Sequence, residues 1–244
     1  MIYYYLIMID KDDIRINYNR LIERVENACN RVKRKPEDIT IVAVTKTLPP
    51  AIIRAGYEVG IRIFGENKVQ ETERKWGELM DIKDKLTLHL IGHLQRNKAR
   101  DAIYLYDVIE SIDSERLALE LDKRIRKSEV KSPFPVLIEV NTSGEETKYG
   151  TSPDRAIDLI EKIIQLPTLS IIGLMTVGPL TTDEKRTRGA FSLLRELGER
   201  AQKIVKPEQV FHLSMGMTDD FEIAIEEGST MIRIGRAIFG ERYE

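Results

Sequence analysis

The chain has 244 residues, of which 42% are hydrophobic and 32% are charged, with a formal net charge of -2. This composition is typical of a globular protein with a large core, and the charge argues against a generally cationic nucleic-acid-binding surface. Cys29 is the only cysteine, which excludes a disulfide framework and a cysteine-based metal cage.

The first nine residues, MIYYYLIMI, are strongly apolar. Nine residues are too few to span a bilayer as a helix, and this stretch lacks the basic region and cleavage site of a secretory signal. We therefore expect residues 1–12 to form an apolar N-terminal extension and residues 13–244 to form one domain. We expect a cytoplasmic protein with no membrane partner.

Apolar residues at helical spacing predict a helix over residues 13–34. Strand-like and helix-like segments then alternate. Apolar runs predict strands at 39–45, 61–64, 87–91, 108–112, 136–140, 169–175, 210–213 and 231–234. Amphipathic patterns predict helices at 50–59, 67–80, 95–102, 114–127, 153–166, 182–205 and 219–227. Eight strands in this alternation predict an α/β fold, a (β/α)8 TIM barrel in a single domain with an extra N-terminal helix.

Polar residues and glycines predict where some of these helices begin and end. Ser152 stands directly before a proline, which is typical of an N-cap followed by proline at the first helical position. Thr218 stands before two aspartates, a pattern that predicts a cap and an acidic first turn. Gly228 predicts the end of that helix.

Lys46 ends the apolar run IVAVTK at residues 41–46. A run without polar alternation predicts a strand buried on both faces, and active sites of parallel α/β folds lie at the carboxyl ends of such strands. Desolvation there can lower the pKa of a lysine, so that its neutral amine attacks a carbonyl group. A solvated lysine after a core strand would show the same pattern, so position alone does not define a site.

The last two expected strand ends carry hydroxyls and glycines. Ser214 and Thr218 offer hydroxyl groups, and Gly216 and Gly235 permit close approach of the backbone to a ligand. Barrels often bind phosphate between these two loops, where a helix opening at Asp219 would present free N–H groups. The glycines are equally compatible with ordinary turns, and the acidic pair opposes an anion, so spacing leaves both interpretations open.

Arg233 lies in a short apolar strand, where an unpaired charge is costly. We expect it either to face the barrel interior with a partner or to mark the solvated strand end. A lysine, a phosphate loop and an inward arginine together match a pyridoxal phosphate site, in which a residue beside the pyridine nitrogen sets how well the ring stores electrons. His89 and His93 are four residues apart, but Gly92 interrupts the segment and no carboxylate motif surrounds them, so we expect no metal site.

Several motifs in chain order resemble the YggS/PROSC family of pyridoxal phosphate homeostasis proteins, from about residue 13 onward. The matching segments are AVTK (43–46), GENKVQE (65–71), HLIGHLQRNK (89–98), NTSGEETKYG (141–150), GLMTVGP (173–179) and residues 213–240. The resemblance implies a fold like the N-terminal barrel of alanine racemase. It also implies that Lys46 carries pyridoxal phosphate as an imine, a Schiff base.

The resemblance assigns further residues to the cofactor. It implies that Arg233 faces the pyridine nitrogen, that Asn67 and Met175 line the ring pocket, and that His89 and Ser143 lie nearby. The residues that it places around the phosphate are Ser214, Gly216, Thr218, Gly235 and Arg236. Family members usually have serine where this chain has Thr218, so the hydroxyl is kept.

The function implied by the resemblance is pyridoxal phosphate homeostasis. The protein would hold the cofactor reversibly and supply or buffer it. The recipients would be apo forms of pyridoxal-phosphate-dependent enzymes. Racemases of this fold append a second domain with a second catalytic base, whereas this chain ends at Glu244, soon after its last motif. We therefore expect a monomer and no enzymatic turnover.

Two other functions stay open. One is a pyridoxal-phosphate-dependent, racemase-like enzyme in which Tyr149 or His89 serves as the second base. The other is a class I aldolase-like barrel that uses Lys46 without a cofactor. The net charge disfavours a third, a nucleic-acid-binding module.

Overall fold

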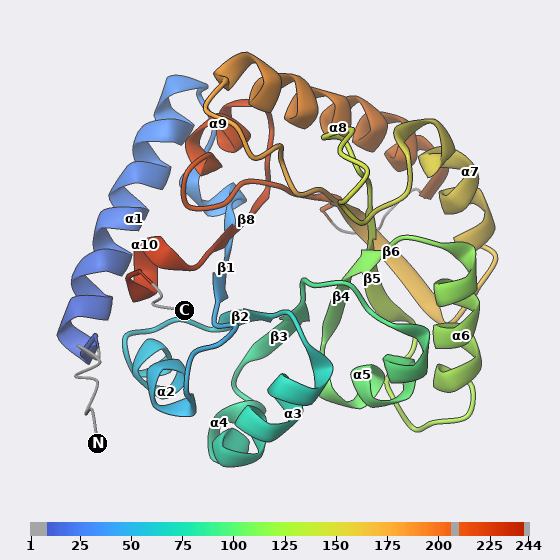
Figure 1. Cartoon of the computed structure of the whole chain (residues 1–244), viewed down its shortest axis with the longest axis horizontal. Coiled ribbons are helices and arrows are strands. Elements are labelled where there is room, and N and C mark those ends of the chain that lie inside the picture. Colours follow the sequence, from blue (N-terminus) through green and yellow to red (C-terminus); the bar gives the residue numbers. More distant parts are fainter. Residues whose placement is uncertain (1–8, 206–209, 242–244) are drawn as a thin grey trace.

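A computed structural model describes residues 9–205 and 210–241. These residues form a closed barrel in which each strand pairs in parallel with the next and β8 returns to pair with β1 (Figure 1). The predicted (β/α)8 TIM barrel is therefore confirmed. The strands are β1 (Thr40–Val44), β2 (Ile63–Glu66), β3 (Thr87–Leu90), β4 (Val108–Ile112), β5 (Phe134–Glu139), β6 (Leu169–Met175), β7 (His212–Ser214) and β8 (Met231–Ile234).

Helices surround the barrel as an outer ring (Figure 1). They are α1 (Lys11–Arg31), α2 (Pro50–Glu58), α3 (Val69–Trp76), α4 (Met80–Lys83), α5 (Ala99–Leu105), α6 (Glu115–Ile125), α7 (Pro153–Ile163), α8 (Glu184–Val205), α9 (Phe221–Glu226) and α10 (Arg236–Phe239). The helix predicted over residues 67–80 is divided into α3, a 3-10 turn (Gly77–Leu79) and α4. No helix among the described residues is long and apolar enough to cross a membrane.

The extra N-terminal helix, α1, begins two residues earlier than predicted, at Lys11. Asp10 caps it, because its carboxylate accepts a hydrogen bond from the Asp13 backbone N–H at 2.8 Å and the Asp13 carboxylate bonds back to the Asp10 N–H. The last two residues of the expected extension 1–12 thus belong to this helix. Residues 1–8 lie outside the described part of the chain.

Two of the predicted helix boundaries are confirmed in position and one is wrong. Ser152 is the N-cap of α7, although its hydroxyl makes no capping hydrogen bond, and Gly228 ends α9 with a φ of +102°. Thr218 does not cap α9. The N-cap is Asp220, whose carboxylate instead accepts a hydrogen bond from the Met217 backbone N–H at 2.6 Å.

The barrel interior has its own small apolar cluster, separate from the main core between strands and helices. Val108, Leu137 and Met175 form this cluster, whereas Ile109 and Ile138, their neighbours along β4 and β5, belong to the main core. Side chains of a strand alternate between its two faces, so every second residue of β4 and β5 faces the barrel axis. The polar residues described below occupy the same inward-facing positions, closer to the carboxyl ends.

Helix α1 brings the N-terminal and C-terminal parts of the barrel together, because it packs against α2 and also against α9 and α10. Figure 1 shows blue α1 beside these two red helices. The guanidinium of Arg24 binds Glu222 at 2.9 Å, and that of Arg31 binds both Glu222 and Glu226. These partly exposed pairs form a network that fixes α1 across the seam between β8 and β1.

Candidate functional site

The residues predicted from strand ends do gather at one mouth of the barrel. Lys46 is half-buried and lies two residues beyond β1, and Asn67 directly follows β2. Met175 and Ser214 are the last residues of β6 and β7. Parallel strands of a closed barrel end on the same side, so these side chains share one face, the usual place of active sites in this fold.

Arg233 faces the barrel interior with partners, which resolves the two interpretations that its sequence position allowed. The residue is 4% exposed. The guanidinium donates hydrogen bonds to the Ser214 carbonyl at 2.8 Å, to the Ser214 hydroxyl at 2.7 Å and to the Thr176 carbonyl at 2.7 Å. Burial lowers the pKa of Arg233, and these acceptors fix the direction in which its remaining N–H groups point.

Glu110, on β4, is an interior residue that the sequence prediction missed. It is fully buried, accepts a hydrogen bond from the Ser214 hydroxyl at 2.5 Å and lies 2.6 Å from Nδ1 of His89. Burial raises the pKa of Glu110, but His89, Arg233 and Ser214 lower it by more, so the net pKa is below its ordinary value. The signal in the sequence was an acid inside the apolar strand VIESI, which demands a buried partner.

Ser214 and His89 are therefore committed to this interior network. The Ser214 hydroxyl donates to Glu110 while it accepts from Arg233. His89 is 3% exposed and presents one ring nitrogen to Glu110. Both side chains therefore hold Glu110 in place in the barrel interior.

The loops after β7 and β8 touch each other, as a shared anion site requires. Gly216 has a φ of +98°, and a β-carbon there would lie 2.6 Å from the Ala224 β-carbon, so only glycine fits. The Thr218 hydroxyl accepts a hydrogen bond from the Ala237 backbone N–H at 3.4 Å. Gly235 is buried at the start of α10. The two loops thus meet, and each has a buried glycine at its start.

The two aspartates of this region are satisfied locally. Asp219 forms an ion pair with Arg236, which also reaches Glu241 at 3.4 Å. Burial raises the pKa of Asp220, whose carboxylate accepts from the Met217 backbone. The Arg236 side chain is exposed and directed at acids, so this residue can offer a ligand its backbone N–H rather than its guanidinium.

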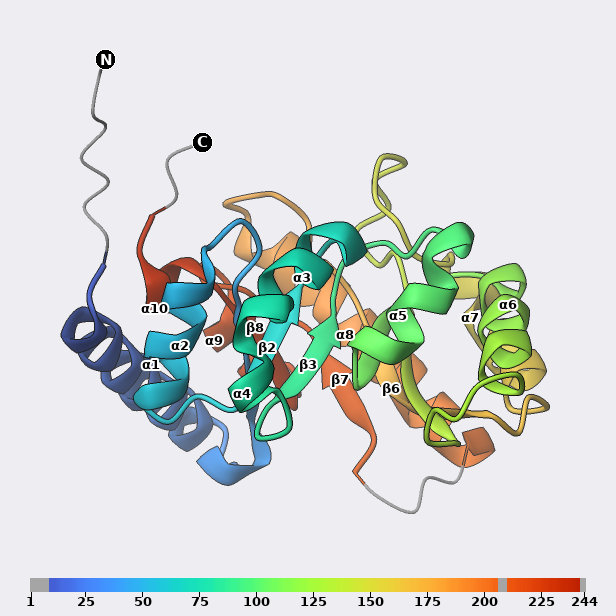
Figure 2. The same cartoon turned by 90° about the horizontal axis from the view of Figure 1, so that it is seen from below.

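Three other predicted residues occupy different depths of the mouth. Met175 is fully buried in the interior apolar cluster. Asn67 is half-buried, and its backbone lies so close to Gly92 that a β-carbon on Gly92 would be 2.5 Å from the Asn67 carbonyl oxygen. Ser143 donates a hydrogen bond to the Asn141 side chain at 2.9 Å, which ties it into its own loop. Figure 2 shows this β5–α7 loop projecting beyond its neighbours.

Glu139, the last residue of β5, is a second buried acid that the sequence prediction missed. It is 5% exposed, pairs in register with Met175, and its Oε2 atom has no hydrogen-bond partner within the described residues. Burial and the nearby Asp113 raise the pKa of Glu139 to about 7. An unsatisfied polar atom at the barrel mouth is costly unless a polar ligand gives it a partner.

Known proteins resemble this chain over nearly its whole length. Residues 9–243 match the family model of the alanine racemase N-terminal domain. The pyridoxal phosphate homeostasis protein of Aquifex aeolicus is 41% identical over 227 residues, 92% of this chain and 96% of that protein. A crystal structure from Bifidobacterium adolescentis has a TM-score of 0.87 and 35% identity, covering 94% of this chain and 95% of its own.

PipY of Synechococcus elongatus, solved with pyridoxal phosphate bound, has a TM-score of 0.76 and 33% identity, covering 89% of this chain and all of its own. The high coverage in both directions shows that the whole barrel is shared rather than one motif. The chain therefore belongs to the family of pyridoxal phosphate homeostasis proteins, which is built on the fold of the alanine racemase N-terminal domain.

Proposed function

We propose that this protein binds pyridoxal 5'-phosphate through a reversible Schiff base on Lys46 and supplies or buffers it within the cytoplasm, with apo enzymes as recipients. The observation that carries the proposal is the pairing of β1 with β8, in which Val42 lies opposite Arg233. This pairing brings the loop of Lys46 beside the buried arginine. The names of the relatives and the cofactor bound to PipY support the same reading.

The described residues fit this ligand at each of its functional groups. Lys46 would offer the amine, and Arg233 would face the pyridine nitrogen. The backbone of Gly216, Gly235 and Arg236, with the hydroxyl of Thr218, offers a low-bulk surface for phosphate. Asn67 and Met175 would line the ring, while His89, Ser143 and Ser214 hold the surrounding structure. The unsatisfied Oε2 of Glu139 would gain a polar partner.

Pyridoxal phosphate, when bound, supplies an aldehyde that bonds reversibly with amines and a ring that can store electrons. The guanidinium of Arg233 cannot release a proton readily, and the carbonyls of Ser214 and Thr176 hold it in place. It therefore keeps a nitrogen beside it unprotonated. A ring in that state is a poorer electron sink, which favours holding the cofactor over transforming amino acids with it.

A racemase-like enzyme is the second candidate, and it needs a further base beside the bound amino acid. Tyr149 is 58% exposed and stacks on His93 with 4.0 Å between ring centroids. His89 is committed to Glu110. Neither arrangement supports a second base, and the relatives are named as homeostasis proteins. We therefore propose a non-enzymatic carrier that acts as a monomer.

The decisive experiment is an absorbance spectrum of the purified protein with added pyridoxal phosphate, before and after borohydride, followed by peptide mapping. We expect a visible band that borohydride traps on Lys46. Lys46→Ala should lose the band yet retain some cofactor through the phosphate loops, whereas Lys68→Ala, a change of an exposed lysine, should keep it. No band in the wild type would overturn the proposal and favour the aldolase-like barrel.

Carrier and enzyme are then distinguished with the loaded protein. Mixed with an apo pyridoxal-phosphate-dependent enzyme, a carrier restores that enzyme's activity at a rate set by release from Lys46. Mixed with L-alanine alone, it leaves the optical rotation unchanged. Sustained racemisation by the loaded protein would instead establish the second candidate.

A further inference from the structure

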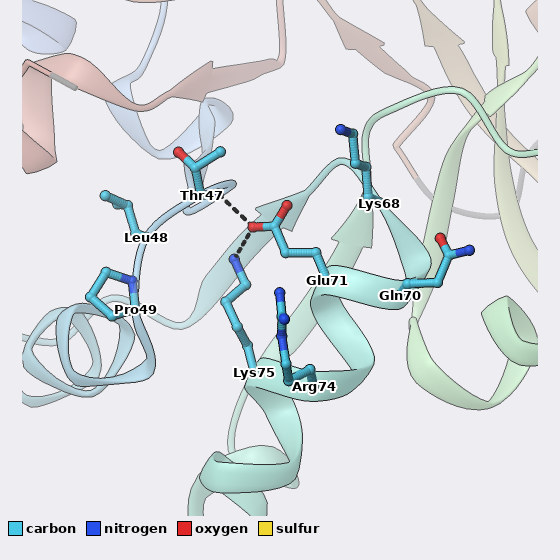
Figure 3. Close-up of a pocket in the computed structure, with 8 residues that line it drawn as sticks. All are labelled: Thr47, Leu48, Pro49, Lys68, Gln70, Glu71, Arg74 and Lys75. Carbon is cyan, nitrogen blue, oxygen red and sulfur yellow. Dashed lines mark hydrogen bonds and ion pairs between the residues drawn. The ribbon is translucent and has the colours of Figure 1, made fainter. Parts of the chain in front are cut away.

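The two residues that flank Lys46 are both hydrogen-bonded to helix α3. On one side, the Thr45 carbonyl accepts a hydrogen bond from Nζ of Lys75 at 2.9 Å. On the other side, the Thr47 backbone N–H donates to Oε1 of Glu71 at 2.6 Å. Figure 3 shows Glu71 between Thr47 and Lys75, reaching both. The short turn that carries Lys46 is thus held at both ends by one helix.

Lys75 is the centre of this arrangement. It is 6% exposed and contacts Glu66 at 2.7 and 2.8 Å and Glu71 at 2.8 Å, in addition to the Thr45 carbonyl. A lysine ammonium has three N–H donors, and these three acceptor groups use them all. Lys75 therefore has no spare donor for a ligand, and its contacts point to a structural purpose.

The two carboxylates that contact Lys75, Glu66 and Glu71, differ in burial and in their other partners. Glu66 is fully buried and also accepts a hydrogen bond from the Thr45 hydroxyl at 2.8 Å. Burial raises the pKa of Glu66, against the opposing effect of Lys75. Glu71 lines the pocket in Figure 3. Burial raises the pKa of Glu71, but the hydrogen bonds from Lys75 and Thr47 lower it by more, so the net pKa is below the ordinary value. Glu71 therefore stays a carboxylate that can hold both donors.

Thr47 explains why the turn must be held. Its φ is +64°, in the left-handed region that β-branched residues rarely adopt. A residue in such a conformation persists only where its surroundings enforce it, and strain of this kind collects at functional sites. Two hydrogen bonds hold it here: the Leu48 backbone N–H donates to the Thr45 carbonyl at 3.0 Å, which closes the turn, and the Thr47 N–H donates to Glu71. Without Glu71 the turn loses one of these two restraints, so we expect the direction of Lys46 to be less fixed.

We propose that Lys75 and Glu71 are positioning residues for Lys46: they hold the strained turn so that the lysine amine meets the ligand's carbonyl carbon in a fixed geometry. This inference rests on the proposed function of Lys46. An amine held on a rigid turn bonds more favourably than one on a loose loop, because less freedom is lost on bonding. The clamp formed by Lys75, Glu71 and Glu66 thereby sets how tightly the cofactor is held and how fast it is released.

The test compares the visible band of Glu71→Met and Lys75→Met, which remove the acceptor and the donor, with that of the wild type, over a pH series and during release to excess hydroxylamine. We expect about tenfold weaker Schiff-base formation, about tenfold faster release and a shifted pH profile, with borohydride still labelling Lys46. The expected factor corresponds to the loss of one charge-assisted hydrogen bond. Arg74→Met should match the wild type. Arg74 lines the same pocket and is next to Lys75 in sequence, but among the described residues the Arg74 side chain makes no hydrogen bond to Thr45 or Thr47.

Thr47→Gly supplies a second, independent measurement, because glycine adopts a positive φ without strain. If Glu71 acts by enforcing the conformation of Thr47, then Glu71→Met should weaken the Schiff base much less in the Thr47→Gly background than alone. Equal losses in both backgrounds, or variants that hold the cofactor as tightly as the wild type with the same pH profile, would overturn the inference and leave the proposed function intact. A wild type without the band would remove both.

Discussion

Arg233 and Glu110 lie 4.0 Å apart, from Nη1 to Oε2, inside the barrel, and the Ser214 hydroxyl bridges them. Both charged side chains are almost fully buried. Each makes the burial of the other tolerable, because an isolated charge in this environment is far costlier than a pair with hydrogen bonds. This pair lies in the barrel interior next to the candidate cofactor site, so we expect it to affect the stability of the barrel and the binding proposed above.

Replacing Arg233 with methionine should destabilise the protein by about 3–5 kcal/mol, because Glu110 would then be a buried carboxylate without its cation. The measurement is urea unfolding of the cofactor-free protein, followed by circular dichroism. The double variant with Glu110→Gln should recover part of the loss, since the uncompensated charge is removed. A loss in the double variant that equals the sum of the two single losses would contradict the pairing.

Arg236→Met is the matched control. Its partners, Asp219 and Glu241, lie on the surface, and the Arg236 side chain is 43% exposed. Exposed pairs of this kind contribute at most about 1 kcal/mol. The contrast between two arginines three residues apart therefore isolates the effect of burial from the effect of charge.

Glu139 predicts a pH dependence of stability. Its pKa rises from 4.5 to about 7 on folding, so the folded state binds more protons than the unfolded state between those values. Stability therefore falls as the pH rises from about 4.5 through 7, by up to roughly 3 kcal/mol, and stays low above that range. Glu139→Gln should be more stable than the wild type at pH 8 and similar to it near pH 4.5.

The measurement for Glu139 is a set of unfolding curves for both proteins from pH 4.5 to 8.5, without cofactor. The difference between the two proteins reports this one carboxyl group, because all other titrating groups are common to both. Parallel curves across the whole range would show that Glu139 is not the source. Binding of a polar ligand at the mouth should flatten the wild-type curve, since it would give Oε2 a partner.

Gly216→Ala should destabilise the protein and weaken phosphate binding, because the new β-carbon would lie 2.6 Å from that of Ala224 at a φ of +98°. We expect a cost of about 1–3 kcal/mol for the strain and overpacking. Gly189→Ala is the control. Gly189 lies inside α8 with nothing within 4 Å of an added β-carbon, so alanine there should stabilise by up to about 1 kcal/mol. Thermal unfolding of both variants tests the contrast.

The positions of β4, β6 and β8 could be predicted to the residue, because each is an apolar run that stops where its strand stops. Strand β2 was placed two residues too early, since Gly65 and Glu66 read as the start of a loop. Glu66 belongs to the strand because Lys75, nine residues away, satisfies it inside the protein. That partnership depends on tertiary packing and leaves no mark on local hydrophobicity.

The same limit explains which residues of the candidate site were missed. Lys46 and Arg233 stand out in sequence because a lone charge at the end of or within an apolar run is conspicuous. Glu110 and Glu139 are equally anomalous within their strands, but only the closed barrel shows that one is satisfied across the interior and the other lacks a partner. Strand β7 was likewise ended one residue early, because the Ser214 hydroxyl finds its partners on β4 and β8.

Barrel closure joins the first strand to the last, with β1 paired to β8 and α1 packed on α9 and α10. During synthesis, Lys46 leaves the ribosome almost two hundred residues before Arg233. A partly made chain therefore contains Lys46 without Arg233, the loops after β7 and β8, or a partner for the edge of β1. Under the proposed function, an incomplete chain would therefore bind the cofactor more weakly than the completed barrel does.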